Sequence, residues 1–315
     1  MLELAQQVLK GNLRAVAKAI SSVENDGPEA RRLMKEIFPH SGQSVVVGIT
    51  GAPGSGKSTL VDQMIPQLKK KDKKIGIVAV DPSSPFSGGA ILGDRIRMMR
   101  HSSDPDVFIR SMATRGHLGG LAKATGEAIT VLEAGGKNLV MVETVGVGQD
   151  EVEVVKLADI IIVVLFPGSG DDVQIFKAGI MEIADVFVLN KADSPDTEKV
   201  ERQLRAMLEM GLKSEEALPL IKTIATEGTG IKKLISTISR LVLDKNRGER
   251  VSRKKRLISW MLKDIITERI YRGVTRDVLP SDWEEWVDKI YKRETDPYTV
   301  ADEIVRKIKG GGGET

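Results

Sequence analysis

"VVGITGAPGSGKSTLVDQM", residues 46–64, decides the fold. An apolar run leads into a glycine-rich turn, which is followed by a lysine, two hydroxyl side chains and a segment with helical spacing. Residues 51–58 match the pattern G-x-x-x-x-G-K-[ST] between a predicted strand and a predicted helix, the context that this loop requires. The pattern therefore predicts a site where backbone N–H groups and a helix N-terminus hold phosphate oxygens.

Each side-chain type in the loop has an expected role. Lys57 supplies positive charge for the β and γ phosphates and is the catalytic candidate; we expect it to be exposed and to contribute little to the core. Ser58 offers a hydroxyl to Mg²⁺, and Thr59 faces the α phosphate. A flexible turn is the alternative, but it would not require lysine and hydroxyls at these offsets. The predicted nucleotide-binding residues here are Gly51, Ala52, Pro53, Gly54, Ser55, Gly56, Lys57, Ser58 and Thr59.

Short runs rich in β-branched residues predict the surrounding sheet. Most are apolar on both faces, which is typical of strands in a largely parallel sheet covered by helices. Helical patterns separate several of them, so we expect an α/β fold with a mostly parallel, doubly wound sheet. The runs are residues 44–50, 74–81, 106–112, 138–144, 159–167, 184–190 and 219–225.

Helical patterns flank the predicted sheet on both sides. Short amphipathic helices are expected before it, and after residue 240 the strands stop. Ser281 with Glu284 forms a possible capping box, and Asp296 before Pro297 is expected to cap a further helix. The predicted organisation is a helical extension at 1–42, the phosphate-loop domain at 43–243, a helical dimerisation arm at 244–309 and a flexible tail at 310–315.

Composition excludes several classes of protein. The 47 Lys and Arg against 44 Asp and Glu leave a net charge of only +3, which argues against a nucleic-acid binder. The basic run at 245–256 lacks interleaved aromatics and is interpreted as a solvated linker or helix face. The chain has no cysteine, signal-peptide pattern or long apolar run, so we expect a cytoplasmic protein without disulfides or membrane contact.

A second motif indicates which base accompanies the phosphates. "NKAD", residues 190–193, ends a predicted strand and matches the N-K-x-D of GTPases. The carboxylate of Asp193 can accept from the N1–H and 2-amino groups of guanine, and adenine offers neither donor there. Lys191 would lie along the base, Asn190 would brace the loop, and the Ala225 amide is the expected donor to guanine O6. Taken alone, "NKAD" could be an ordinary turn at a strand end.

Further motifs resemble one family, the MeaB/ArgK-type G proteins, relatives of the methylmalonic aciduria type A protein. The resemblance covers roughly residues 10–300 and implies a GTPase of the signal-recognition-particle and MinD-like class that binds GTP or GDP with Mg²⁺. It further implies a homodimeric chaperone that loads and protects adenosylcobalamin in methylmalonyl-CoA mutase or a related mutase. The motifs are "VDPSSPFSGGAILGDRIRM" from 80, "SMATRGHLGGLA" from 111, "ETVGVGQDE" from 143 and "GSGDDVQIFKAGIMEIAD" from 168.

The resemblance also implies roles for individual residues. Asp81, Asp94 and Glu143 would join Ser58 around Mg²⁺, a role for which carboxylates are suited chemically. Gly146 would sense the γ phosphate through its amide. Asp171 and Lys177 would communicate with the mutase and support hydrolysis. No glutamine directly follows Gly146, so a low intrinsic rate that a partner raises is expected.

Two alternative functions are disfavoured by the sequence. A metal-insertion GTPase would need a metal-handling segment, and the chain has no cysteine and only three histidines. A small-molecule kinase or transport-associated ATPase is disfavoured by "NKAD".

An apolar stripe at helical spacing predicts a homodimer formed by the arm, although packing against the same chain is the alternative. The stripe consists of Ile258, Leu262, Ile265, Ile266 and Ile270.

Overall fold

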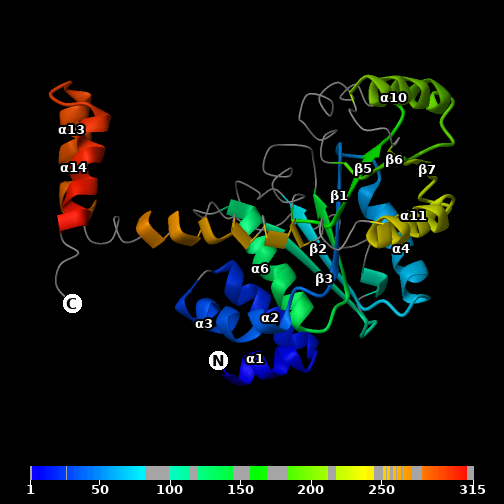
Figure 1. The fold of residues 1–315 in the computed structure, drawn as a ribbon, viewed down its shortest axis with the longest axis horizontal. Coiled ribbons are helices and arrows are strands. Elements are labelled where there is room, and N and C mark those ends of the chain that lie inside the picture. The colour runs from blue at the N-terminus through cyan, green and yellow to red at the C-terminus, as the bar shows by residue number, and fades with distance from the viewer. Residues whose placement is uncertain are drawn as a thin grey trace. The chain divides into compact units, whose positions relative to one another are not determined.

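The computed structural model divides the chain into two compact units, Met1–Leu257 and Ile258–Thr315. Figure 1 shows the fold, coloured from blue at the N-terminus to red at the C-terminus. The residues described are 2–25, 27–81, 99–101, 103–113, 120–144, 157–168, 184–211, 218–244, 251–252, 254–255, 258–259, 261–263, 265–267, 269–271 and 279–310.

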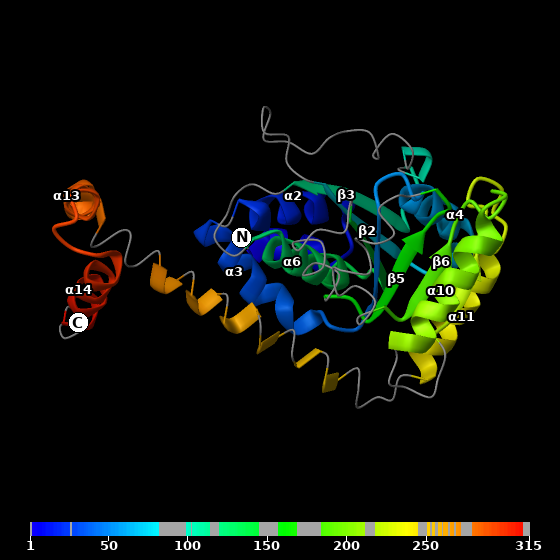
Figure 2. The same cartoon turned by 90° about the horizontal axis from the view of Figure 1, so that it is seen from above.

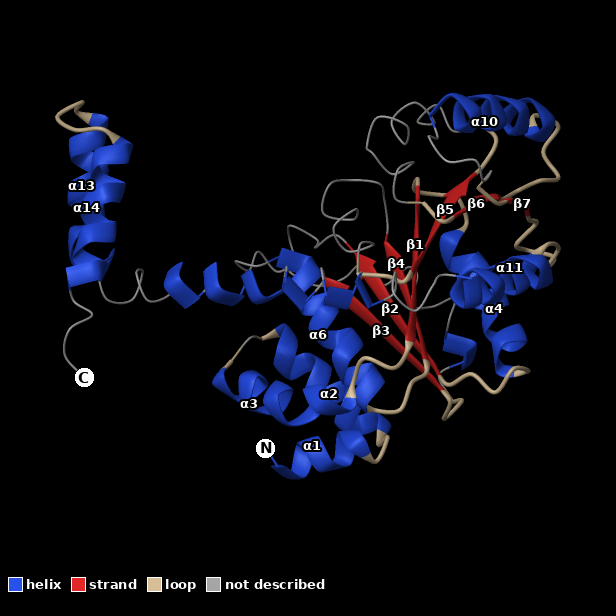
Figure 3. Ribbon diagram, in the orientation of Figure 1, coloured by secondary structure: helices blue, strands red, loops and turns tan. Residues whose placement is uncertain are grey.

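The first unit is built on a seven-stranded sheet with the order β3-β2-β4-β1-β5-β6-β7 (Figure 3). Every pairing between neighbours is parallel. The predicted α/β fold is therefore confirmed, and each predicted run overlaps one strand. The strands are β1 (Val45–Gly51), β2 (Ile75–Asp81), β3 (Val107–Ala113), β4 (Leu139–Thr144), β5 (Ile160–Leu165), β6 (Val186–Leu189) and β7 (Leu220–Lys222).

Helices cover both faces of this sheet, as its apolar strands require. On one face lie α4 (Lys57–Lys69) and α11 (Ile231–Asp244), whose apolar side chains form one core with the strands. On the other lies α6 (Gly120–Ala134), which contacts β2 and β4. Figures 1 and 2 both place α6 opposite α4 and α11. The unit also contains α10 (Thr197–Gly211), between β6 and β7 in sequence, and the short 3-10 helix η2 (Met99–His101).

The expected N-terminal helices are present and pack on α6. They are α1 (Leu2–Leu9), α2 (Leu13–Glu24) and α3 (Pro28–Ile37), followed by the 3-10 helix η1 (Phe38–His40). Asn12 caps α2, because its side-chain oxygen accepts from the N–H groups of Arg14 and Ala15 at 3.0 and 3.1 Å.

Carboxylates bind the chain at the amino edge of the sheet. Asp159 accepts from the N–H of Val46 at 2.9 Å, and Asp185 accepts from the N–H of Ile161 at 2.7 Å. Glu133, on α6, accepts from the N–H groups of Gly42 and Ser44. These bonds join β1 to β5, β5 to β6, and α6 to the segment before β1, all at the edge opposite the phosphate loop.

The second unit contains α13 (Leu279–Tyr291) and α14 (Pro297–Gly310). The predicted cap of α14 is confirmed: Asp296 accepts from the N–H groups of Tyr298 and Thr299 at 2.8 and 3.0 Å. The capping box predicted at Ser281 is wrong, because α13 begins two residues earlier and Ser281 lies inside it. No helix among the described residues is both long and apolar enough to cross a membrane.

Candidate functional site

The phosphate loop connects β1 to α4 at the carboxyl edge of the sheet (Figure 1). Gly51 has φ +152°, and a Cβ there would lie 2.1 Å from the carbonyl oxygen of Val164. Gly56 has φ +89°, and a Cβ there would lie 2.3 Å from the Nδ2 atom of Asn190. Neither position tolerates a side chain. As the N-cap, Gly56 leaves the first N–H groups of α4 without a capping side chain, which suits phosphate binding.

The side chain of Lys57 lies against the backbone of the phosphate loop. Its Nζ atom donates to the carbonyl oxygens of Gly51 and Ala52 at 2.8 and 3.0 Å. The residue is only 5% exposed, so the expectation of an exposed lysine is wrong. The reason is that the loop turns its carbonyls inward and needs a donor among them. Its cationic group thus lies within the predicted phosphate cradle.

The other loop residues differ in exposure. Ala52 and Ser55 are buried, Thr59 is half-buried, and Pro53 and Gly54 are exposed at the tip of the loop.

Ser58 and Glu143 meet across the sheet, although 85 residues separate them. The Ser58 Oγ atom donates to the Glu143 carboxylate at 2.5 Å, and both residues are buried. Glu143 lies on β4 beside Ile49 of β1, so the strand register places its carboxylate next to the loop. Buried hydroxyl and carboxylate oxygens are the hard ligands that Mg²⁺ prefers, and the pair therefore fits the predicted metal role.

Other predicted ligands are only partly described. Asp81 is the last residue of β2, at the same edge of the sheet. Asp94, Gly146, Asp171 and Lys177 lie outside the described residues. Within the described ranges, no group of three or more His, Asp or Glu residues could hold a metal alone. Ser58 and Glu143 would thus supply only part of a ligand set, to which phosphate oxygens and water would have to contribute.

Asn190 joins the phosphate loop to the predicted base loop. Its Nδ2 atom donates to the carbonyl of Ser55 at 2.8 Å. Its Oδ1 atom accepts from the Thr223 hydroxyl at 3.0 Å and from the Ala225 N–H at 3.1 Å. Asn190 is buried and its backbone N–H donates to Leu165 at the end of β5. The predicted bracing role therefore has a complete set of partners.

The Ala225 bond corrects one expectation. The amide that was assigned to guanine O6 is used inside the protein, because the buried Oδ1 of Asn190 lies next to it. Thr226 follows in the same loop, and its N–H has no acceptor among the residues that the structure describes. Thr226 is therefore the better candidate donor to O6. Sequence spacing alone could not separate two adjacent amides, since their difference depends on the position of Asn190.

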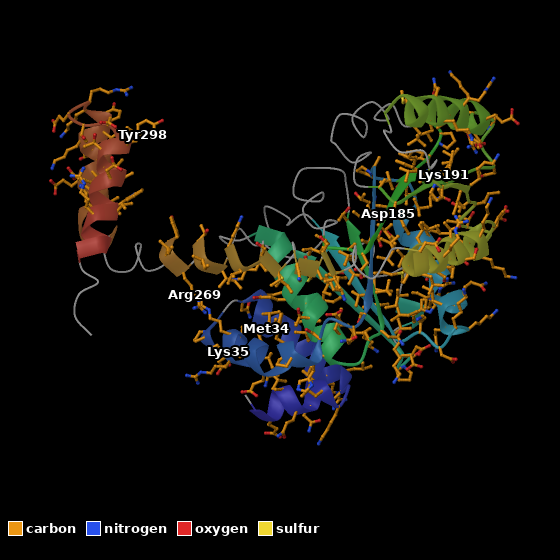
Figure 4. The ribbon with its side chains drawn as sticks, in the orientation of Figure 1. Met34, Lys35, Asp185, Lys191, Arg269 and Tyr298 are labelled. Carbon is orange, nitrogen blue, oxygen red and sulfur yellow. The ribbon has the colours of Figure 1, made fainter. Side chains whose placement is uncertain are left out.

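The base-side residues project from the end of β6. Figure 4 labels Lys191 at this end and Asp185 at the other. Lys191 has φ +54°, and its carbonyl accepts from the N–H of Ser194 at 3.0 Å. The resulting turn leaves the Lys191 and Asp193 side chains exposed. Their position beside the phosphate loop allows a base to contact them while its phosphates lie on α4.

A family model described as methylmalonyl Co-A mutase-associated GTPase MeaB matches residues 16–277. A GTPase-family protein of Pyrococcus abyssi is 47% identical over 316 residues, covering 98% of this chain and 97% of its own length. The mouse mitochondrial methylmalonic aciduria type A homolog is 35% identical over 251 residues, covering 73% of this chain and 60% of its own.

A solved structure shares the fold at greater sequence distance. The crystal structure of a LAO/AO transport system kinase has a TM-score of 0.70 and 23% identity, covering 98% of this chain and 97% of that one. At that identity the likeness shows the fold alone. The family match, which spans most of the chain and includes the phosphate and base loops, shows more: this chain belongs to the MeaB family of P-loop GTPases.

Proposed function

We propose that this chain is a GTP-hydrolysing chaperone that gates the loading and protection of adenosylcobalamin in methylmalonyl-CoA mutase or a related cobalamin-dependent mutase. One observation carries the proposal: a family described as mutase-associated matches the chain across a phosphate loop and base loop joined by Asn190. The mouse relative's name supports the same association for that protein. A cytoplasmic location is part of the proposal.

GTP and GDP are the proposed ligands. Lys57 would neutralise the β and γ phosphates, the first N–H groups of α4 would bind their oxygens, and Asp193 would select guanine. Ser58 and Glu143 would hold Mg²⁺, which supplies charge neutralisation on the phosphates when bound. The buried Ser58–Glu143 hydrogen bond supports this assignment, because both oxygens already face one another beside the loop.

GTP hydrolysis is proposed to be slow in the free protein and faster when the client, the cobalamin-dependent mutase, is bound. The predicted hydrolytic residues Asp171 and Lys177, like the Mg²⁺ candidate Asp94, fall outside the described residues, and their roles stay predictions. Lys57 is the candidate catalytic residue whose contacts are described: it holds positive charge where negative charge develops on the transferred phosphoryl group.

We also propose that the chain forms a homodimer through the helices after residue 245. Ile258, Leu262, Ile266 and Ile270 recur every four residues and are 51%, 55%, 47% and 59% exposed. A row of large apolar side chains at this spacing is a stripe that a second copy could cover. Light scattering on a chain ending near residue 245 tests the assembly, and an unchanged oligomeric state would exclude this interface.

The client is tested by phosphate release with and without a cobalamin-dependent acyl-CoA mutase and its cofactor. We expect the mutase to raise the rate at least about tenfold, equivalent to about 1.4 kcal/mol of barrier. Asp171→Ala and Lys177→Ala should blunt that rise while sparing GTP affinity. Unchanged rates with every available mutase, and no complex by gel filtration in any nucleotide state, would remove the chaperone role and leave a GTPase with another client.

A further inference from the structure

Lys191 lies over the ring of Phe166, a residue that neither motif of the nucleotide site includes. The Lys191 Nζ atom is 4.2 Å from the ring centroid. An ammonium within about 6 Å of an aromatic face is attracted by the ring quadrupole. Phe166 is half-buried, and Lys191 is exposed. The half-buried ring therefore provides an aromatic face for the ammonium of an exposed side chain.

The backbone of two neighbouring strands builds this contact. Leu165 of β5 pairs with Leu189 of β6, and the N–H of Asn190 extends the ladder by donating to the Leu165 carbonyl at 2.8 Å. Phe166 follows β5 directly, just as Asn190 follows β6. The positive φ of Lys191 then turns the chain out of the strand direction. Phe166 directly follows β5, and Lys191 directly follows Asn190, which is bonded to β5. The buried strands therefore set the positions of Phe166 and Lys191.

A nearby carboxylate could compete with the Phe166 ring for the ammonium of Lys191. Asp193 lies two residues beyond Lys191, and its exposed carboxylate is the group proposed to accept from guanine. Lys191 makes no ion pair with any carboxylate in the described part of the chain. An ion pair between Lys191 and Asp193 would engage the carboxylate that the base needs, and the ring opposes it by holding the ammonium elsewhere.

We propose that Phe166 is a positioning residue for guanine recognition, which holds Lys191 along the base and keeps the Asp193 carboxylate available to it. The inference rests on the proposed GTP site. It assigns to Phe166 no contact with the phosphates or with Mg²⁺. Losing the ring should therefore weaken guanine-nucleotide affinity and leave the rate at saturating GTP unchanged. The expected loss is about two- to fivefold, the range for an exposed cation–π contact.

Ionic strength separates this role from simple packing. Without the ring, Lys191 can pair with Asp193, and salt screens such an exposed pair. The affinity lost on removing the ring should therefore be largest at about 20 mM salt and smaller at about 500 mM, where the Debye length is a few ångströms. A residue that only filled space would show the same loss at both.

The experiment is an equilibrium titration of the full chain with GDP and with ADP at both salt concentrations. Phe166→Leu and Phe166→Met remove the ring and keep an apolar side chain, so either variant that folds serves the test. We expect weaker GDP binding in both, a smaller change for ADP, and near wild-type binding in Phe166→Tyr, which retains a ring. Phe38→Leu is the matched control, because Phe38 is 48% exposed on η1, away from the base loop.

A double-mutant cycle tests whether Phe166 acts through Lys191. In a Lys191→Met background, Phe166→Leu should cost no further GDP affinity, since no ammonium remains to hold. Any of three results would overturn the inference. They are an equal loss of GDP affinity in that background, an equal loss in Phe166→Tyr, and no loss in the ring-free variants at low salt. If wild type does not prefer GDP to ADP, the proposed guanine site itself fails, a result distinct from these.

Discussion

Asn190 donates from its side-chain amide to the carbonyl of Ser55, which lies 135 residues earlier in the chain, at a distance of 2.8 Å. The same side chain accepts from Thr223 and Ala225, so a single amide joins the predicted phosphate loop to the predicted base loop. An amide suits both roles, because its nitrogen donates at one side while its oxygen accepts at the other.

Replacing this amide should damage both binding and stability. Asn190→Ala leaves the buried partners at Ser55, Thr223 and Ala225 unsatisfied, so we expect a loss of about 1–3 kcal/mol in the free energy of unfolding and at least about tenfold in GDP affinity. Urea unfolding and GDP titration measure the two effects. Asn138→Ala is the control, since its exposed side chain accepts from the N–H of Lys74 at the other edge of the sheet. Wild-type GDP affinity in Asn190→Ala would show that the two loops are positioned independently.

Base selectivity should follow the carboxylate of Asp193. In Asp193→Asn the amide can donate to the 2-carbonyl of xanthine, and we expect preference to move from GTP toward xanthosine triphosphate. Competition binding with the two nucleotides measures the shift. The control is Asp72→Asn, an exposed site on the chain after α4 where φ is +54°, a value that asparagine tolerates. Equal affinity of wild type for ATP and GTP would contradict the assignment.

Loss of the loop lysine should affect stability as well as chemistry. Lys57→Ala removes the donor to the carbonyls of Gly51 and Ala52, so hydrolysis should fall to background and unfolding should become easier by about 1–3 kcal/mol. Phosphate release and urea unfolding report the two effects. Lys69→Ala, at the far end of the same helix, breaks a partly exposed pair with Asp104 and should cost at most about 1 kcal/mol without changing hydrolysis. Full activity in Lys57→Ala would exclude its phosphate role.

Glu133 should give folding stability a dependence on pH. Burial raises the pKa of its carboxyl above the usual range, and the N–H groups of Gly42 and Ser44 oppose that rise only in part. The folded chain therefore keeps this proton to higher pH than the unfolded chain does. The more tightly held proton adds to the free energy of unfolding at low pH, and this stabilisation is lost as pH rises through the raised pKa.

Urea unfolding of wild type and Glu133→Gln between about pH 4 and pH 7 measures this contribution, with exposed Glu36→Gln as the control. The wild-type stability should fall with rising pH relative to Glu133→Gln. Parallel pH profiles for the two proteins would show that Glu133 does not carry the effect.

Local patterns were sufficient for the sheet and the loops, but not for contacts between them. β-Branched runs that are apolar on both faces indicated every strand, and the glycine–lysine spacing located the phosphate loop, because both depend on neighbouring residues. The burial of Lys57, the engagement of the Ala225 amide and the ring beneath Lys191 depend on where distant segments meet. No periodicity encodes those meetings. The start of α13 was misplaced for a local reason: Pro280 is acceptable in a first helical turn, so Leu279 could begin the helix ahead of Ser281.

The central place of β1 has a consequence for synthesis on the ribosome. This strand emerges early, yet both of its neighbours, β4 and β5, emerge much later, and the N–H of Val46 donates to a carboxylate 113 residues downstream. Until then β1 lacks both of the strands that flank it in the finished sheet. The β1 segment is therefore open to aggregation until β4 and β5 have been translated, because pairing with strands distant in sequence is slow and leaves unpaired strand edges exposed.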